Sequence, residues 1–251
     1  METDGRTRWE RVSLTRWGQY LSRHERDAIL RAEALAGEPG AALEVGVEGG
    51  RWAALLERRG WTLTCTDVDE VTLAICQERL PDATCIRVDP GDTRLPVDDA
   101  SVRLLLVMEV APVSEAPWFG AEAARVLEPG GILCLGFTNS LSVRALVYRL
   151  LRRLGLRGSP EYEGPPYSEV RASLEENGIE PVWSSGLCWG PFTRESNNPL
   201  IPLVTALEAI LGLRRLVAAS PFVLLIGRRS ATRGGATTGR PEGATSYTRA
   251  R

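Results

Sequence analysis

The chain has 251 residues, of which 43% are hydrophobic, so its length and composition fit one α/β domain with additions. Its formal net charge of −2 argues against a protein dedicated to binding nucleic acid or another polyanion. The chain contains no lysine, which excludes a lysine base or Schiff-base chemistry. It has one histidine and five cysteines without CxxC spacing, so we expect no metal site and buried, reduced thiols. Charged residues recur throughout Met1–Asp27 without an apolar core, which predicts a cytoplasmic protein that lacks a signal peptide.

Residues 1–40 are expected to form a helical N-terminal segment ahead of the first strand. Ser22, followed three positions later by Glu25, has the pattern of a capping box, which predicts a helix from this point to about Ala36. His24 lies in the first turn of that predicted helix, and we expect it to face solvent rather than to act in catalysis. The aromatic residues upstream are expected to pack the segment onto the domain, and they are Trp9, Trp17 and Tyr20.

The stretch Ala41–Asp69 predicts a strand, a glycine turn, a helix and a second strand. Ala41–Val45 is an apolar run typical of a buried parallel strand. The glycines that follow, Gly46, Gly49 and Gly50, allow the backbone to turn sharply and to approach a ligand closely.

A carboxylate stands at the end of the second predicted strand. Arg51–Arg59 has the apolar spacing of an amphipathic helix, and Trp61–Thr66 has the β-branched and aromatic residues of a strand. Asp67 follows directly, 21 positions after Gly46. In nucleotide-binding folds a carboxylate near this position hydrogen-bonds a ribose.

This arrangement resembles the cofactor-binding motifs of the class I S-adenosylmethionine-dependent methyltransferases. The first loop of that family has the pattern acid-x-Gly-x-Gly-x-Gly, and here it is Glu44-Val45-Gly46-Val47-Glu48-Gly49-Gly50. Glu44, Gly46 and Gly50 match the pattern, whereas Glu48 replaces the middle glycine. The Glu48 side chain either crowds the methionine part of the cofactor or accepts a hydrogen bond from its ammonium group, and we expect the second. The loop contains no GxG, which argues against a dinucleotide.

The resemblance continues in order from Leu43 to Arg228. Ser101–Met108 is similar to the fourth strand of the family, and Arg125–Gly131 with Ile132–Phe137 is similar to the lead into its fifth strand. Later segments are similar to its last helix and closing hairpin, namely Tyr167–Gly178, Pro181–Cys188 and Ser220–Arg228. The resemblance implies an α/β, Rossmann-like fold over residues 41–229, with a seven-stranded, mostly parallel sheet, an antiparallel last strand and helices on both faces.

The resemblance also implies S-adenosylmethionine as the cofactor and a set of residues that hold it. For residues 1–40 it implies, as an alternative to packing alone, a lid over the cofactor that lines the substrate pocket. Asp67, with Val68 beside it, is expected to hold the ribose hydroxyls. An acid after the predicted third strand is expected near the adenine amino group, and both Asp89 and Asp92 are candidates. Glu109, after the fourth strand, is expected either to orient the cofactor or substrate or to cap the next segment. The expected cofactor-binding residues are Glu44, Gly46, Glu48, Gly50, Asp67, Val68, Asp89 and Glu109.

Two stretches outside the core combine apolar residues with arginines. Residues 139–167 look like an insertion after the fifth strand, and their leucines and arginines predict a basic amphipathic helix. Leu200–Leu213 is a second apolar stretch, followed by Arg214 and Arg215. We expect both stretches to cover the sheet and build the substrate pocket, and peripheral contact with a membrane surface is the alternative. Neither stretch is long enough to span a bilayer.

The reaction implied by the family is transfer of a methyl group from S-adenosylmethionine to an O, N or C atom, and we expect a small-molecule acceptor. The sequence identifies neither the acceptor nor a general base. A domain that binds the cofactor without turnover stays open, as does a methyltransferase for a lipid-linked or glycan intermediate at a membrane. The missing GxGxxG disfavours a nicotinamide-dependent oxidoreductase. The tail, residues 230–251, is poor in apolar residues and is expected to be disordered.

Overall fold

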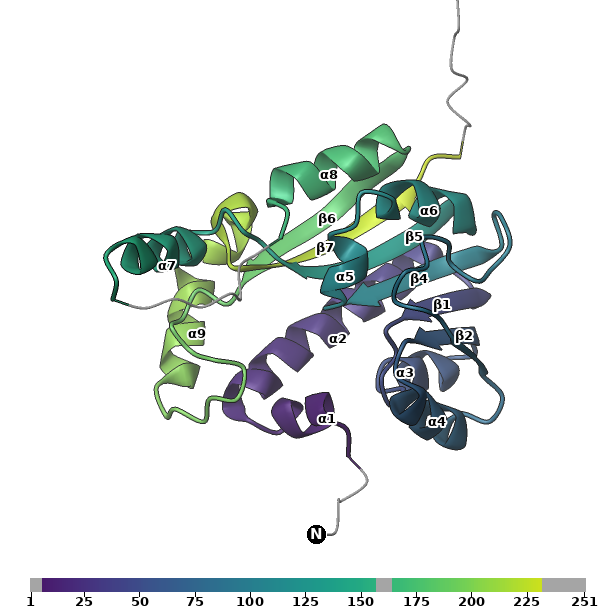
Figure 1. Ribbon diagram of the computed structural model, residues 1–251, viewed down its shortest axis with the longest axis horizontal. Coiled ribbons are helices and arrows are strands. Elements are labelled where there is room, and N and C mark those ends of the chain that lie inside the picture. Colours follow the sequence, from purple (N-terminus) through teal and green to yellow (C-terminus); the bar gives the residue numbers. More distant parts are fainter. Residues whose placement is uncertain (1–5, 157–163, 232–251) are drawn as a thin grey trace, which may run out of the picture.

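A seven-stranded sheet forms the centre of the computed structural model, which describes residues 6–156 and 164–231 (Figure 1). Its strands are β1 (Ala41–Val45), β2 (Thr62–Asp67), β3 (Thr84–Arg87), β4 (Val102–Met108), β5 (Leu127–Thr138), β6 (Ile179–Leu187) and β7 (Phe222–Arg229). Their order is β3-β2-β1-β4-β5-β7-β6. Strands β1 to β5 pair in parallel, and β7 is antiparallel to both β5 and β6. The expected mostly parallel sheet with an antiparallel last strand is therefore confirmed.

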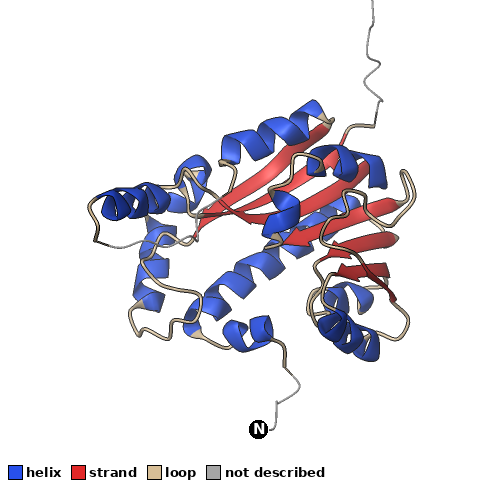
Figure 2. Ribbon diagram, in the orientation of Figure 1, coloured by secondary structure: helices blue, strands red, loops and turns tan. Residues whose placement is uncertain are grey.

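Helices cover both faces of the sheet (Figure 2). The helices of the described residues are α1 (Arg8–Ser13), α2 (Arg16–Ala36), α3 (Ala53–Glu57), α4 (Glu70–Arg79), α5 (Ala111–Ser114), α6 (Phe119–Val126), α7 (Val143–Arg153), α8 (Tyr167–Glu176) and α9 (Ile201–Ile210). Side chains of α2, α3 and α4 share one core layer, and those of α6 and α8 share the other.

Strand β4 shows how the sheet divides the core. Successive side chains of a strand point to opposite faces. Leu104 and Leu106 pack with α2, α3 and α4, whereas Leu105 and Val107 pack with α6 and α8. All four side chains are fully buried. Because both faces are covered, the strand is a continuous apolar run instead of an alternating one.

The second helix begins earlier than its capping pattern predicted. It starts at Arg16, where the Thr15 hydroxyl accepts a hydrogen bond from the Gly18 backbone N–H at 3.0 Å. Ser22 therefore lies inside α2 and is not its N-cap. The prediction failed because the turn that contains Trp17 is buried against the domain, which extends the helix toward the N-terminus.

His24 does not face solvent as expected. Its ring lies edge-on to Tyr20, with centroids 4.9 Å apart, and burial lowers its pKa to about 4. The expected packing role of the N-terminal aromatics holds for Trp17 and Tyr20, which are both buried. Helix α2 ends at Ala36 as predicted.

The helix after the first glycine turn is shorter than predicted. Helix α3 covers Ala53–Glu57, whereas the apolar spacing predicted Arg51–Arg59. Gly50 has a φ of +81°, outside the right-handed helical region, so the chain completes its turn before the helix begins.

The leucines of α7 and α9 do not cover the sheet. Ala145 is the one buried residue of α7, and Ile201 and Glu208 are the buried residues of α9. The expected leucine cover was therefore wrong, because each helix contacts the domain along one edge and turns its leucines away from it. No helix in the described part of the chain is long and apolar enough to cross a lipid bilayer. Residues 157–163 of the insertion and 232–251 of the tail lie outside the described residues.

Candidate functional site

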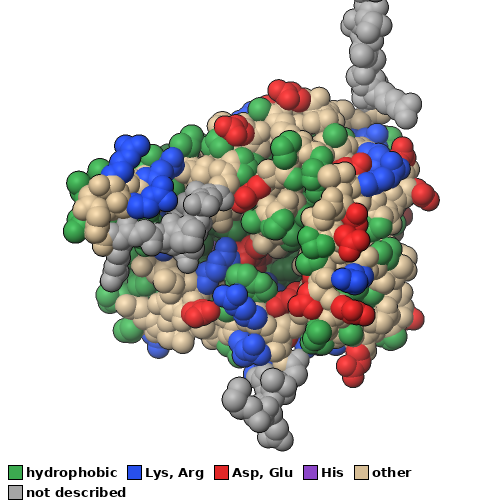
Figure 3. Space-filling view, viewed as in Figure 1, with side chains coloured by type: hydrophobic (Ala, Val, Ile, Leu, Met, Phe, Trp, Pro, Cys, Tyr) green, Lys and Arg blue, Asp and Glu red, His purple; other side chains and the backbone are tan. Residues whose placement is uncertain are grey.

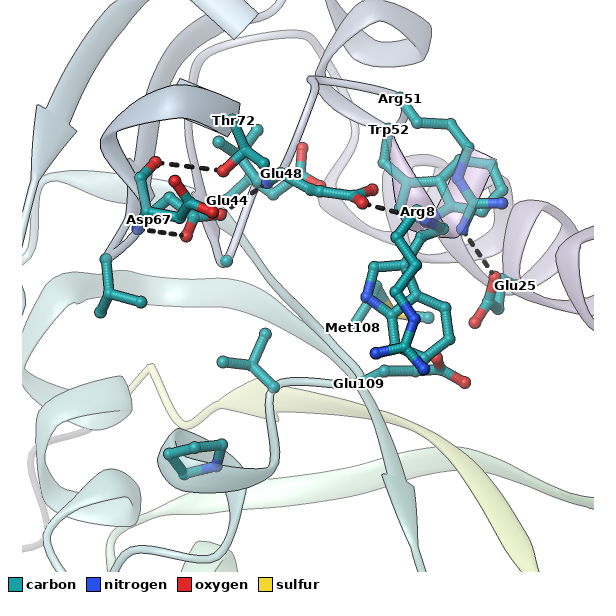
Figure 4. Close-up of a pocket in the computed structure, with 17 residues that line it drawn as sticks. Arg8, Glu25, Glu44, Glu48, Arg51, Trp52, Asp67, Thr72, Met108 and Glu109 are labelled. Atoms are coloured by element: carbon teal, nitrogen blue, oxygen red, sulfur yellow. Dashed lines mark hydrogen bonds and ion pairs between the residues drawn. The ribbon is translucent and has the colours of Figure 1, made fainter. Parts of the chain in front are cut away.

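A cavity of about 420 Å³ opens at the carboxyl ends of β1, β2 and β4 (Figure 4). Ligands of open α/β sheets bind at this edge. On one side of the cavity lie Glu44, Glu48 and Asp67, and on the other lie Glu25 and Glu109. The predicted cofactor residues that line it are Glu44, Gly46, Glu48, Asp67, Val68 and Glu109.

The first loop presents its backbone to the cavity. Gly46 has a φ of +69°, and a Cβ at this position would lie 2.5 Å from Val110 Cγ2. Glu48 has a φ of +51°, so the residue that replaces the family's middle glycine keeps a left-handed conformation. Gly50 does not line the cavity. It faces α4, where a Cβ would lie 3.0 Å from Cys76 Sγ.

The Asp67 carboxylate is held in place by two backbone donors. The Glu48 N–H donates to its Oδ2 at 2.7 Å, and the Asp69 N–H donates to its Oδ1 at 3.0 Å. These bonds fix the carboxylate at the end of β2 and tie it to the first loop. Val68 follows at the cavity wall with its side chain partly open to solvent.

Glu44 is a buried carboxyl group with an unused acceptor. It sits on β1 with 3% of its surface exposed, and its Oε2 has no hydrogen-bond partner. Burial raises the pKa of Glu44 to about 8, and the positive charge of Arg51 opposes part of that rise. A cation bound beside this group would favour its ionised form.

Glu109 lies between the cavity and the loop that precedes α9. Its φ of +61° turns the chain immediately after β4. Its Oε2 accepts a hydrogen bond from Arg194, and its Oε1 is buried without a partner. Glu109 lines the cavity, and its two predicted roles stay predictions.

The N-terminal segment adds residues that the sequence did not indicate as site residues. The Trp9 backbone N–H donates to Glu48 Oε1 at 3.0 Å, and its side chain lines the cavity. Glu25 accepts a hydrogen bond from Arg51 at 3.2 Å, and burial raises its pKa to about 8. Glu25 fits the capping pattern that begins at Ser22, so the sequence offered no separate sign that it is a buried acid beside the site.

The two predicted adenine contacts lie outside this cavity. Asp89 and Asp92 are both exposed, and the Asp89 N–H donates to Asp92 Oδ2 at 3.0 Å. Neither is among the residues that line the cavity. Their role at the adenine stays a prediction.

A second cavity of about 280 Å³ shares Arg8 and Trp9 with the first. Arg194 lines this second cavity while its partner Glu109 lines the first, so their ion pair lies between the two. The remaining lining residues combine aromatic and basic side chains with small groups, and they are Trp17, Leu21, Thr138, Arg144, Cys188, Phe192, Thr193, Pro221 and Phe222.

Three thiols lie together behind the first loop. The sulfur atoms of Cys65, Cys76 and Cys85 are all within 4.8 Å of one another. Cys65 and Cys76 are buried, as expected, and Cys85 is half-buried. Cys76 packs against Gly50, so the cluster supports the loop from the side opposite the cavity.

Comparison with known proteins agrees with this architecture. Residues 43–135 match the family model described as a methyltransferase domain. No curated protein sequence matches the chain. Among solved structures, a sarcosine dimethylglycine methyltransferase candidate from Galdieria sulphuraria is 15% identical, with a TM-score of 0.58 over 85% of this chain and 87% of the other.

Two further structures show how widely this fold is used. The [4+2]-cyclase SpnF is 18% identical, with a TM-score of 0.58 over 92% of this chain and 86% of the other. A geranyl diphosphate methyltransferase solved with GPP and sinefungin is 14% identical, with a TM-score of 0.53 over 80% and 77% of the two chains. Such low identities establish the fold and not the reaction. Residues 43–135 therefore match a methyltransferase domain, and the strand order gives the chain the Rossmann-like α/β fold of the methyltransferase structures to which it is similar.

Proposed function

We propose that this chain transfers a methyl group from S-adenosylmethionine to a small-molecule acceptor. The observation that carries this function is a cradle at the first loop. Gly46 leaves no room for a side chain, and Asp67 is fixed by two backbone N–H groups at the end of β2. Backbone that must approach a ligand closely, next to an oriented carboxylate, suits a nucleoside.

The charges around the first cavity also suit this cofactor. S-adenosylmethionine carries a sulfonium and an ammonium group, and both are positive. Glu44 and Glu109 each hold a buried carboxylate oxygen without a hydrogen-bond partner. A bound cation would satisfy such oxygens, whereas the pyrophosphate of a dinucleotide would be repelled by them.

Each lining residue then has a distinct part in binding. Asp67 would accept hydrogen bonds from the ribose hydroxyls, and Val68 would supply apolar contact beside it. Glu44 and Glu48 would face the ammonium group. Glu48 already accepts the Trp9 N–H through Oε1, which leaves its other oxygen for the ligand.

The chemistry needs little from the protein beyond position. When bound, S-adenosylmethionine would supply an activated methyl group: a lone pair of the acceptor would bond to the methyl carbon while the C–S bond breaks, and S-adenosylhomocysteine would leave with that electron pair. Holding two reactants in line supplies much of the acceleration of such a step. Trp9 and Arg8 line both cavities, so α1 lies beside the path between them.

The second cavity favours an acceptor that is partly apolar and carries a negative charge. Trp17, Phe192 and Phe222 form an aromatic wall. Arg144 donates to the backbone oxygens of Gly190 at 3.2 Å and Phe192 at 3.0 Å, which hold its guanidinium group beside that wall. Guanidinium groups next to aromatic rings recognise carboxylates and phosphates.

Calorimetric titration with S-adenosylhomocysteine and NADH, side by side, tests the cofactor. We expect binding of S-adenosylhomocysteine alone, and loss of that binding in Gly46→Val. The matched control is Gly91→Val, because a Cβ at Gly91 meets nothing within 4 Å. Binding of NADH in preference to S-adenosylhomocysteine would overturn the assignment.

Methyl transfer from radiolabelled S-adenosylmethionine tests the acceptor class. The panel pairs aromatic carboxylates and phosphates with neutral analogues of the same ring. We expect product from the anionic members, with a higher KM in Arg144→Gln. Product from the neutral members alone would refute an anionic acceptor. Cofactor binding without product from any member would favour a domain that binds without turnover.

A further inference from the structure

Helix α7 carries an apolar stripe that faces away from the domain. Its members recur every three or four positions and therefore lie on one face, and they are Val143, Leu146, Val147, Leu150 and Leu154. Each is at least half exposed, and Leu150 reaches 57%. Ala145, the buried residue of the helix, lies on the opposite face.

Helix α9 is inverted relative to an ordinary surface helix. Its single acidic residue, Glu208, is 1% exposed and accepts hydrogen bonds from Tyr20, from Arg214 at 3.1 Å and from the Trp189 N–H at 3.3 Å. Apart from the buried Ile201, its large apolar residues are mostly exposed, with Leu203 at 58% and Ile210 at 78%. Burying the acid and exposing leucine and isoleucine is unfavourable for a helix that meets only water.

The two helices rest on the same segment at one end of the molecule (Figure 1). Arg144 of α7 donates to the Gly190 and Phe192 backbone oxygens. Gly190 also lies against α9, since a Cβ there would be 2.9 Å from Val204 Cγ1. We call the outward faces of α7 and α9 the apolar end surface.

This apolar end surface is basic as well as apolar. Arg149 and Arg153 flank the stripe on α7, and Arg215 follows α9, whereas the neighbouring Arg214 is paired with the buried Glu208. Within residues 139–156 and 197–219 the one acidic residue is Glu208, which is buried. Figure 3 shows arginine and hydrophobic side chains together over α7.

We infer that the apolar end surface docks on an anionic lipid bilayer. Leucines of an amphipathic helix enter the boundary between head groups and acyl chains, and its arginines meet the anionic head groups. A symmetric contact between two copies of this chain fits the charges less well. It would bring two sets of arginines together without an exposed acid on either helix to pair with them.

Flotation of the full chain with vesicles tests this docking. One vesicle population contains equal parts of phosphatidylcholine and phosphatidylglycerol, and the other contains phosphatidylcholine alone. We expect binding to the anionic vesicles that weakens at high salt. Each arginine near the surface should contribute about fivefold to the partition coefficient. Arg149→Glu/Arg153→Glu should therefore lower it by about 25-fold or more, and Leu146→Glu/Leu150→Glu should abolish binding.

The matched control is Arg58→Glu/Arg87→Glu, which makes the same charge change at exposed positions near the opposite edge of the sheet. It should bind within about twofold of the wild type. Equal loss in this control would overturn the inference, because net charge would then explain binding. Absence of vesicle binding would also overturn it. If the chain instead forms a dimer that Leu146→Glu/Leu150→Glu dissociates, the surface binds a second copy and not a bilayer. Vesicle binding does not depend on methyl transfer, so either can fail alone.

Discussion

Glu48 replaces a glycine of the motif and keeps the left-handed backbone conformation, with a φ of +51°. A side chain in the left-handed region costs roughly 1–2 kcal/mol, which glycine avoids. Here the Glu48 N–H donates to Asp67 and its carboxylate accepts from Trp9, and these two hydrogen bonds offset that cost. The predicted contact between Glu48 and the cofactor's ammonium group is not tested by this arrangement and stays a prediction.

The first residue-scale prediction concerns Asp67. Asp67→Ala should weaken S-adenosylhomocysteine binding by roughly ten- to a hundredfold, because hydrogen bonds to a charged group contribute about 1.5–3 kcal/mol. Isothermal titration calorimetry measures the change. Asp82→Ala, an exposed acid just before β3, is the matched control and should bind normally. An affinity within twofold of the wild type in a folded Asp67→Ala protein would contradict the ribose assignment.

The second concerns the proton on Glu44. With its pKa raised to about 8, Glu44 is mostly protonated at pH 7 in the free protein. A cationic ligand favours the ionised form, so binding should release a proton and affinity should rise with pH up to about 8. Calorimetry in two buffers of different ionisation enthalpy counts that proton. Glu44→Gln should abolish the release, and an unchanged count in this variant would point to another group.

At the scale of elements, burial against the rest of the chain decided which face of a helix or strand lies inward, and local sequence patterns did so only in part. Strand β4 was predictable because its run of apolar residues is long and continuous, which requires cover on both faces. The apolar stretch Leu200–Leu213 was expected to cover the sheet, but most apolar side chains of α9 face outward. Its composition is apolar almost all round, so hydrophobic spacing gives no inward face.

The buried acid of α9 gives the element-scale prediction. Removing one partner of a buried ion pair costs roughly 3–5 kcal/mol, and the partial exposure of Arg214 places Glu208→Ala toward the lower end. Chemical denaturation should show this loss in the free energy of unfolding. Glu176→Ala, at an exposed position of α8, should change it by less than about 0.5 kcal/mol. A neutral effect of Glu208→Ala would mean that α9 is not anchored by its acid.

At the scale of the whole molecule, two kinds of carboxyl group make the stability of the fold depend on pH in opposite directions. Burial raises the pKa values of Glu25 and Glu44 to about 8, above the ordinary value of 4.5. The folded state then binds more protons than the unfolded state, so stability falls as pH rises from about 4.5 to 8. Hydrogen bonds to arginine lower the pKa of Glu122 despite its partial burial, so that contribution is lost as pH falls below 4.5.

The melting temperature of the ligand-free protein should therefore be higher near pH 5 than at pH 8. Differential scanning fluorimetry across this range measures it. Glu44→Gln should raise the melting temperature at pH 8 and leave it nearly unchanged at pH 5, because the amide carries no charge at either pH. A melting temperature that rises steadily toward pH 8 would refute the buried, protonated state of these acids.

The sequence by itself determined the order of the strands along the chain, the glycine loop and the carboxylate after β2. These features depend on local periodicity and turn chemistry, which are written in consecutive residues. It also placed six of the eight predicted cofactor residues at the cavity. The two exceptions have local reasons, because Gly50 supports the loop from behind and Asp89 lies in an exposed turn.

Only the tertiary structure brought Trp9, Glu25 and Arg194 to the site. The Trp9–Glu48 and Arg194–Glu109 pairs join residues 39 and 85 positions apart, and no local pattern signals such contacts. The same holds for the leucines of α7 and α9. Amphipathic spacing shows that a helix has an apolar face, but packing against the rest of the chain decides whether that face is buried.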